Sequence, residues 1–236
     1  MDRINVVTIA GFDPSGGAGI LADIKTFNKL GINGLAVLTA NTYQTEKTFK
    51  GIDWINKENI QQQLNLLLEN YEINFFKIGI IENFNVLEEI LEFIHNNTDD
   101  PFIIWDPILV SSTGFIFHTT YDINQSVFKL INVITPNWEE AKKIFKTENI
   151  ENLLAIKEPA IYIKGGHRID KRGTDILISE NKLLEIEGRD FGGKSRHGSG
   201  CVFSSALLGY IALGYNLENA ARKAKKITEK YIINEE

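Results

Sequence analysis

The sequence has almost no cysteine, and this absence excludes a fold held together by disulfides. Cys201 is the only cysteine among 236 residues, so no disulfide can form within the chain. Disulfide-rich scaffolds are typical of small secreted proteins. Long apolar runs are also absent, and the N-terminal segment has a short apolar run without the small-residue cleavage site of a signal peptide. We therefore expect a cytoplasmic protein that does not cross a membrane.

An excess of basic residues is lacking too. Lys and Arg total 25 against 31 for Asp and Glu, which gives a formal net charge of −6 and a pI near 5.4. A protein that binds nucleic acid along its surface needs a basic face, so we expect no nucleic-acid partner. A small anionic substrate is compatible with this charge, because a local basic pocket can lie within an acidic molecule.

Linkers and repeats are missing as well. No Pro-, Gly- or Ser-rich stretch divides the sequence. The hydrophobic fraction of 43% and the charged fraction of 24% are those of an ordinary globular protein. A chain of this length buries a full core without disulfides or metals. We therefore expect one domain that spans residues 1–236.

Short β-branched runs alternate with amphipathic stretches along the chain. The runs predicted as strands are 4–9, 35–39, 75–78, 102–105, 132–134 and 161–163. The stretches predicted as helices are 19–30, 58–68, 86–94, 139–145, 199–213 and 217–233. Segments 174–179 and 183–186 are expected to form a hairpin. The alternation predicts an α/β fold of three layers, in which helices cover both faces of a mostly parallel central sheet.

Ligands of such sheets bind beyond the carboxyl ends of the strands, so the loops there are the candidate site. Loop 11–19 holds four glycines and opens a helix, which allows a close backbone approach and offers free N–H groups. It lacks the Lys-Ser/Thr pair of a P-loop and the dinucleotide glycine spacing. A simple capped turn is therefore an alternative. Asp13 and Asp23 add polar groups that can orient a ligand.

Asp106 and Lys164 each follow an apolar run predicted as a strand. Asp106 precedes Pro107, which favours an extended backbone, and its carboxylate suits a metal or phosphate site. Lys164 precedes two glycines, which let a polyphosphate approach the ammonium. Each residue has a plain alternative, since the aspartate can cap a turn and the lysine can lie in solvent.

Asn137 and Glu140 lie three residues apart, on the same side of the first turn of a predicted helix. Mg²⁺ keeps most of its waters and often binds through one carboxylate plus substrate phosphates, a role that Glu140 can fill. The same spacing is typical of helix capping, in which the two residues only satisfy the start of the helix.

Segment 196–201 precedes a long helix of small and apolar residues. Gly198, Ser199 and Gly200 form a turn whose N–H groups can converge on the charge of a transferring phosphoryl group. Cys201 lies in the first turn, where the helix dipole is expected to lower the thiol pKa, so that a thiolate can accept a proton. A lone cysteine in an apolar helix is otherwise typical of a small buried hydrophobe.

Together these segments resemble the ribokinase-like superfamily, and within it the hydroxymethylpyrimidine/phosphomethylpyrimidine kinases of thiamine biosynthesis. Segment 8–27 is close to that family's signature, and the order of the other loops agrees. The resemblance implies a kinase that uses ATP and Mg²⁺ to phosphorylate the hydroxymethyl group of 4-amino-5-hydroxymethyl-2-methylpyrimidine. The monophosphate of this alcohol is a further candidate acceptor, and a homodimer is implied.

The resemblance also implies roles for individual residues. Those implied for the pyrimidine pocket are Gly11, Ala18, Asp23, Gln44 and Ile80. Those implied for ATP are Asp106, Asn137, Lys164 and Ser199, and those for Mg²⁺ are Asp106, Asn137 and Glu140. Those implied for catalysis are Gly198, Ser199 and Gly200 as an anion hole, with Cys201 as the base. Gln44 depends on the resemblance alone, because its position otherwise indicates a polar loop residue.

The sequence departs from the family pattern in three places. The family usually has a methionine near the position of Ile80, and it more often has threonine at the position of Ser199. Segment 111–115 replaces the common Ala-Lys-Ser-Gly-Asp, which removes a lysine able to hold a phosphorylated substrate. Three alternatives stay open: a pyridoxal or pyridoxine kinase of the same branch, a non-catalytic pyrimidine-binding protein, and a Rossmann dehydrogenase, which the missing glycine spacing disfavours.

Overall fold

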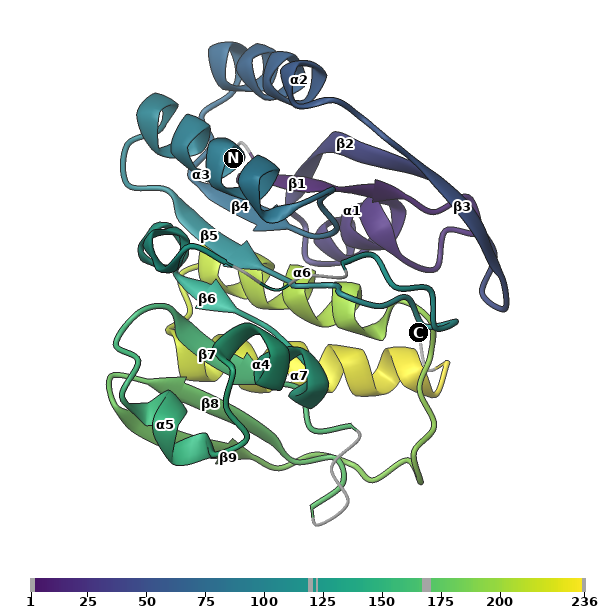
Figure 1. The fold of residues 1–236 in the computed structure, drawn as a ribbon, viewed down its shortest axis with the longest axis vertical. Helices are drawn as coiled ribbons and strands as arrows, with labels where there is room; N and C mark the ends of the chain where they lie inside the picture. Colours follow the sequence, from purple (N-terminus) through teal and green to yellow (C-terminus); the bar gives the residue numbers. More distant parts are fainter. Residues whose placement is uncertain (1–2, 119–120, 122, 167–170, 235–236) are drawn as a thin grey trace.

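The computed structural model describes residues 3–118, 121, 123–166 and 171–234. Nine strands of this part of the chain form one sheet, in the order β3-β2-β1-β4-β5-β6-β7-β8-β9 (Figure 1). The strands are β1 (Asn5–Phe12), β2 (Asn33–Gln44), β3 (Phe49–Trp54), β4 (Phe75–Ile78), β5 (Phe102–Trp105), β6 (Val133–Ile134), β7 (Ala160–Ile163), β8 (Asp175–Ser179) and β9 (Lys182–Ile186).

The centre of the sheet is parallel and its edges are antiparallel. Strands β2, β1, β4, β5, β6 and β7 pair in parallel. β3 pairs antiparallel with β2, and the β8–β9 hairpin pairs antiparallel with β7. The inner strands β4, β5 and β7 are short and largely apolar, as expected for strands covered on both faces.

Helices cover both faces of the sheet (Figure 1). One layer contains α1 (Gly19–Lys29), α6 (Ser199–Ala212) and α7 (Leu217–Ile232). The other contains α2 (Lys57–Asn70), α3 (Phe84–Asn97), the 3₁₀ helix η1 (Gln125–Leu130), α4 (Trp138–Phe145) and α5 (Ile150–Leu154). α6 and α7 run side by side along the sheet, so the first turn of α6 is fixed against both the sheet and its neighbour.

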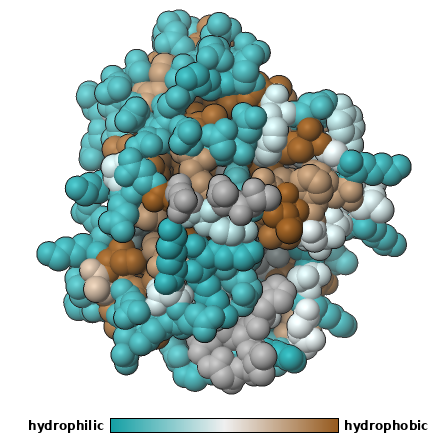
Figure 2. Space-filling model, viewed as in Figure 1, coloured by the Kyte–Doolittle hydropathy of each residue, from teal (hydrophilic) through white to brown (hydrophobic). Residues whose placement is uncertain are grey.

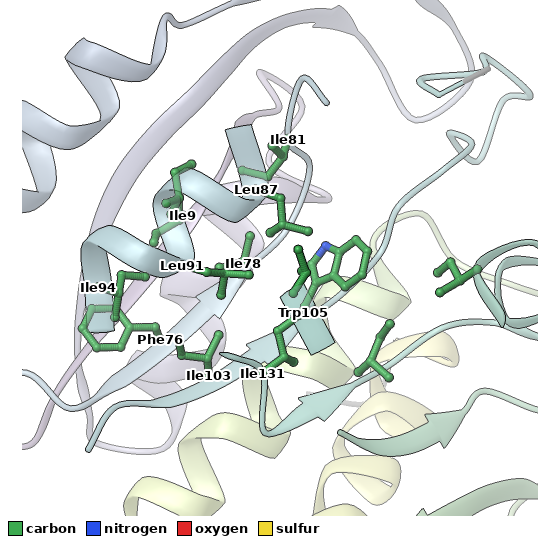
Figure 3. Packing of buried hydrophobic residues seen from close by; sticks show 14 of the residues in the cluster. Ile9, Phe76, Ile78, Ile81, Leu87, Leu91, Ile94, Ile103, Trp105 and Ile131 are labelled. Carbon is green, nitrogen blue, oxygen red and sulfur yellow. The ribbon is translucent and has the colours of Figure 1, made fainter. Parts of the chain in front are cut away.

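The core consists of two apolar layers, because successive side chains of a strand point to opposite faces. Ile103 and Trp105 of β5 pack under α3, whereas Ile104 packs in the layer of α6 and α7. Figure 3 shows part of the first layer, where Leu91 of α3 lies over Ile78 of β4. Each face of the sheet is thereby packed against its own layer of helices.

The predicted α/β architecture is observed, and each predicted strand and helix is present. β4 and β5 have the predicted bounds, and the ends of the other elements are shifted. Three elements were not predicted: β3, η1 and α5. β3 mixes apolar and polar residues because it is a partly exposed edge strand. β2 extends to Gln44, beyond the predicted end at Thr39, so Gln44 is the last residue of a strand and not a loop residue.

Hydrophilic residues cover most of the face seen in Figure 2, and the hydrophobic residues on it form separate patches. Large apolar side chains that remain exposed include Tyr43, Phe115 and Ile116. In the part of the chain that the structure describes, no helix is both long and apolar enough to cross a bilayer.

Candidate active site

A cavity of about 490 Å³ lies at the carboxyl ends of the parallel strands. The segments that follow β1, β4, β5, β6 and β7 meet there with the N-terminus of α6. The predicted site residues that line it are Gly11, Ala18, Gln44, Ile80, Asp106, Asn137, Glu140, Lys164, Gly198, Ser199, Gly200 and Cys201. The structure therefore brings together residues that are distant in the sequence, and of the predicted set it leaves Asp23 off the wall.

The turn before α6 packs directly against the Gly-rich loop. Gly198 has a φ of 79°, in the left-handed region that favours glycine, and a Cβ there would lie 1.8 Å from the Gly17 carbonyl oxygen. A Cβ on Gly200 would lie 3.2 Å from Lys164 Nζ. Among the described residues, no side chain caps this helix N-terminus. The Ser199 N–H donates to the Arg196 carbonyl oxygen at 3.0 Å, which leaves the N–H groups of Gly200 and Cys201 for an anionic ligand.

The Cys201 thiol lies in the first turn of α6 and is only 5% exposed. Burial raises the pKa of the thiol to about 11, although the Lys77 ammonium and the Gly19 backbone N–H act to lower it. This reverses the direction predicted from the helix dipole, because the loss of thiolate solvation is the larger effect. At neutral pH the group is therefore a thiol.

Lys164 and Asp106 form an ion pair in the cavity, with Nζ 2.8 Å from Oδ1. Asp106 is 1% exposed and also accepts hydrogen bonds from Thr135 (3.2 Å) and Ser204 (3.3 Å). Burial raises the pKa of Asp106, but the ammonium groups of Lys164 and Lys77 outweigh it and hold that pKa below its usual value. The carboxylate and the ammonium are therefore both charged.

Asn137 and Glu140 form the capping arrangement that the sequence left open. Asn137 Oδ1 accepts from the Glu140 N–H at 2.9 Å, and Glu140 Oε2 accepts from the Asn137 N–H at 2.7 Å. Both residues also line the cavity. Burial raises the pKa of Glu140 to about 7, and Lys164 acts to lower it. Capping thus holds the carboxyl group in place beside the cavity.

The cavity offers few ligands for a divalent metal ion. In the described ranges, no three or more His, Cys, Asp and Glu residues gather into a metal-binding group. Asp106 and Glu140 are two buried carboxyl groups on one cavity, and the Asp106 charge acts to raise the pKa of Glu140. A cation would relieve this repulsion. The pair fits Mg²⁺, which keeps waters and phosphate oxygens in its shell and needs few protein ligands.

Asp23 lies below the cavity wall, where it binds protein groups only. Its side chain is fully buried and forms an ion pair with Lys77, with Oδ2 2.8 Å from Nζ. Thr8 and Ser205 donate hydrogen bonds to its two oxygens at 2.6 and 2.7 Å. Lys77, in contrast, lines the cavity. Asp23 therefore reaches the site through Lys77.

His197 connects three loops around the cavity. Its Nε2 lies 2.8 Å from Asp13 Oδ2, and its Nδ1 lies 2.8 Å from Ser112 Oγ. Burial raises the pKa of Asp13, but hydrogen bonds from His197 and Ser15 outweigh it and lower that pKa to about 2. Asp13 is thus engaged within the protein. Ser112 belongs to the segment that departs from the family pattern.

A second part of the wall is uncharged and suits a flat ring. Gln44 ends β2, and Gly11, near the end of β1, lies against the side chain of Ile80, which follows β4. Phe117 adds an aromatic face and packs edge-on against Phe49, with ring centroids 5.3 Å apart. An amide that can donate and accept, set among apolar groups, can orient a polar heteroaromatic ring.

Sequence comparison identifies the family. The sequence matches the family described as phosphomethylpyrimidine kinase over residues 13–236. A hydroxymethylpyrimidine/phosphomethylpyrimidine kinase from Aquifex aeolicus is 32% identical over an alignment of 240 residues, which covers 97% of this chain and 94% of that protein. The chain belongs to the phosphomethylpyrimidine kinase family. It is therefore a kinase, as predicted.

Solved structures of this family and its neighbours have the same fold. The phosphomethylpyrimidine kinase from Clostridium difficile 630 has a TM-score of 0.76 at 30% identity, covering 97% of this chain and 100% of that one. The pyridoxal kinase from Staphylococcus aureus, solved in complex with ADP, has a TM-score of 0.81 at 24% identity, covering 99% and 89%. At this identity the second likeness supports the fold alone. The predicted ribokinase-like α/β fold is confirmed.

Lys77 and His197 also line the cavity of this kinase. The sequence alone had suggested no role for either residue. Lys77 stands between Phe76 and Ile78 in an otherwise apolar strand, and a lysine in such a run indicates a buried charge that needs a partner. His197 precedes the Gly198 turn directly. Its links to distant loops follow only from the tertiary structure.

Proposed function

We propose that this kinase transfers the γ-phosphoryl group of ATP to the hydroxymethyl oxygen of 4-amino-5-hydroxymethyl-2-methylpyrimidine. The observation that carries the proposal is that one cavity holds both sets of groups that the reaction needs. The uncapped N-terminus of α6 and Lys164 suit phosphates, and Gln44 and Phe117 suit a flat polar ring. The names of the Aquifex aeolicus and Clostridium difficile relatives agree with this activity.

On the acceptor side, Gln44 recognises the ring. Its amide both donates and accepts, which matches the amino group and the ring nitrogen of an aminopyrimidine. Gly11, Ala18 and Ile80 line the same cavity and add no charge to it. Asp23 does not contact the pyrimidine in this proposal, because both of its carboxylate oxygens accept hydrogen bonds from protein groups.

On the phosphate side, Lys164 attracts the transferring group while the α6 N-terminus stabilises the charge that develops on it. Gly200 and Cys201 supply N–H groups at this terminus, because the Ser199 N–H is bonded to the Arg196 carbonyl oxygen at 3.0 Å. Asp106, Glu140 and Asn137 would hold the water shell of Mg²⁺. A cation held by these residues would supply positive charge that offsets part of the charge of the phosphates.

Cys201 receives the proton of the attacking hydroxyl group. As the hydroxymethyl oxygen bonds to the γ-phosphorus, the bond from phosphorus to the bridging oxygen breaks, ADP leaves, and the hydroxyl proton passes to the Cys201 thiolate. Because burial holds the thiol pKa near 11, the thiolate is a minor species at neutral pH but a strong base once it forms. The rate is therefore expected to rise with pH.

The proposal is tested by measuring ADP formation with three acceptors in parallel: the pyrimidine alcohol, its monophosphate, and pyridoxal. We expect the pyrimidine alcohol to give the highest kcat/KM, at least about tenfold above pyridoxal, since a misfit of one substituent in a pocket costs about this factor. The monophosphate is expected to react more slowly, because segment 111–115 lacks a lysine. Preference for pyridoxal, or no acceptor-dependent ADP, would contradict the proposal.

The family resemblance also supports a homodimer that acts in the cytoplasm, where ATP is abundant. Sedimentation of the purified protein tests the assembly. We expect a mass near twice the 26.6 kDa of the chain, and a mass that stays at one chain at micromolar concentration contradicts it.

A further inference from the structure

Lys77 is a fully buried lysine in the middle of the sheet, with a side chain that is 0% exposed. Its neighbours on β4, Phe76 and Ile78, point into the apolar layer under α3. Alternation along the strand therefore directs Lys77 to the opposite layer, toward α1 and α6. A buried ammonium is costly unless it is paired, and a leucine here would continue the apolar pattern.

The ammonium of Lys77 is held by a network that joins four elements. Asp23 of α1 lies 2.8 Å from its Nζ. Thr8 of β1 donates to the same Asp23 oxygen at 2.6 Å, and Ser205 of α6 donates to the other at 2.7 Å. Because both carboxylate oxygens are engaged, the position of Asp23 is fixed, and with it the position of the Lys77 charge.

Through Ser205, this network reaches the helix that carries Cys201. Ser205 follows Cys201 by one turn of α6, so both side chains leave the same face of the helix. Lys77 and Cys201 line the same cavity. Of the charged groups around the thiol, the Lys77 ammonium has the largest effect, and it favours the thiolate, whereas Asp23 and Asp106 act against the thiolate.

Charged and titratable groups face this pair from several elements. They are Asp23 of α1, Asp106 beyond β5, Lys164 beyond β7 and Tyr231 of α7. Lys164 is already bound to Asp106 at 2.8 Å, so its charge is offset by that carboxylate. Lys77 is therefore the cation best placed to offset a negative charge on the Cys201 sulfur.

We propose that Lys77, held in place by Asp23, stabilises the Cys201 thiolate and acts in phosphoryl transfer through Cys201, as a positioning residue. The catalytic part rests on the function proposed above, but the effect on the thiol does not. The thiol first loses its proton to solvent, and the thiolate then takes the proton of the acceptor hydroxyl. Lys77 keeps its proton throughout.

The test uses the single cysteine of the chain. Iodoacetamide alkylates only the thiolate, so its rate with Cys201 reports the thiolate fraction without ATP or an acceptor. Three variants are compared with the wild type between pH 8 and 9.5, with mass spectrometry as the readout: Lys77→Met, Asp23→Asn and Lys225→Met. Lys225 is the matched control, because it is also buried and paired, with Asp175 at 2.7 Å, but belongs to another network.

The two members of the pair are expected to act in opposite directions. Lys77→Met should slow alkylation about tenfold or more, since each unit by which the thiol pKa rises lowers the thiolate fraction tenfold. Asp23→Asn should accelerate it, because the unpaired Lys77 charge then acts on the sulfur alone. Lys225→Met should leave the rate unchanged. Rates that change in the same direction for Lys77→Met and Asp23→Asn would overturn the proposal, because that result indicates a role in packing only.

A double variant covers the case in which Lys77→Met does not fold. In Asp23→Asn/Lys77→Met no buried charge is left unpaired, and it should still be alkylated more slowly than the wild type, because the lysine has the larger effect on the thiol. A rate equal to or above that of the folded wild type would overturn the proposal.

In the kinase assay, Lys77→Met should lower kcat and leave the KM for ATP within about twofold. If the wild type itself showed no kinase activity with the pyrimidine alcohol, that result would contradict the proposed function and leave the effect of Lys77 on the thiol unaffected.

Discussion

The Lys164 ammonium lies 2.8 Å from Asp106 Oδ1, so the cation expected at the phosphates is bound to the carboxylate expected at the metal. The pair holds both charges at the carboxyl edge of the sheet and keeps the buried Asp106 ionised.

Lys164→Ala should lower kcat/KM for ATP by about 10²–10³-fold, the usual effect of removing one group that stabilises transition-state charge. The measurement is steady-state kinetics at saturating acceptor. Lys171→Ala is the control, because Lys171 also pairs with a carboxylate, Glu185 at 2.8 Å, but lies exposed on the hairpin side. Equal losses in the two variants would contradict a specific role for Lys164.

Gln44→Ala should raise the KM for the pyrimidine alcohol by about 10–100-fold, because a ring edge is then left without its hydrogen-bond partner. The KM for ATP should change less than twofold. Gln62→Ala, on the exposed face of α2, is the control and should behave as the wild type. An unchanged acceptor KM in Gln44→Ala would contradict a role for Gln44 in binding the acceptor.

Gly198→Ala should destabilise the protein and abolish phosphoryl transfer. A side chain at its φ of 79° costs about 1–2 kcal/mol, and its Cβ would also meet the Gly17 carbonyl oxygen at 1.8 Å. Gly192→Ala separates the two causes, since Gly192 has a φ of 65° but no atom within 4 Å of an added Cβ. Urea unfolding should show the larger loss for Gly198→Ala. A loss confined to Gly192→Ala would contradict the packing described here.

Asp13 should make stability depend on pH in the acid range. Hydrogen bonds from His197 and Ser15 lower its pKa from 3.8 to about 2 despite burial. The stabilisation is therefore complete above pH 4 and is lost as the pH falls through 2, by about 2 kcal/mol. Asp13→Asn should remove this part of the difference between pH 5 and pH 2 in urea unfolding. Asp99→Asn, at an exposed position, should lose stability over that interval as the wild type does.

The residues proposed for the phosphates could be predicted from the sequence to lie together, because most of them follow apolar strands and the carboxyl ends of parallel strands meet at one edge. Asp106, Asn137, Lys164 and the Gly198 turn all lie on that edge. Gln44 required the family resemblance, since β2 runs five residues beyond its predicted end.

The electrostatics of the site could not be predicted in the same way. The helix dipole is a local property, and it gave the wrong direction for the pKa of Cys201, because the burial of the thiol in the folded protein has the larger effect. The ion pair of Asp23 and Lys77 joins residues 54 positions apart. Nothing in either segment alone indicates that the two meet, or that Asp23 serves the site from behind the wall.

The most direct test is the transfer of labelled γ-phosphate from ATP to the pyrimidine alcohol by the wild type and by Cys201→Ala, in single turnover between pH 7 and 9.5. The account predicts a phosphorylated hydroxymethyl product, a wild-type rate that rises about tenfold per pH unit toward the thiol pKa of about 11, and a rate about 10²–10⁴-fold lower without that rise in Cys201→Ala. A variant within a few-fold of the wild type, with the same pH dependence, would contradict it.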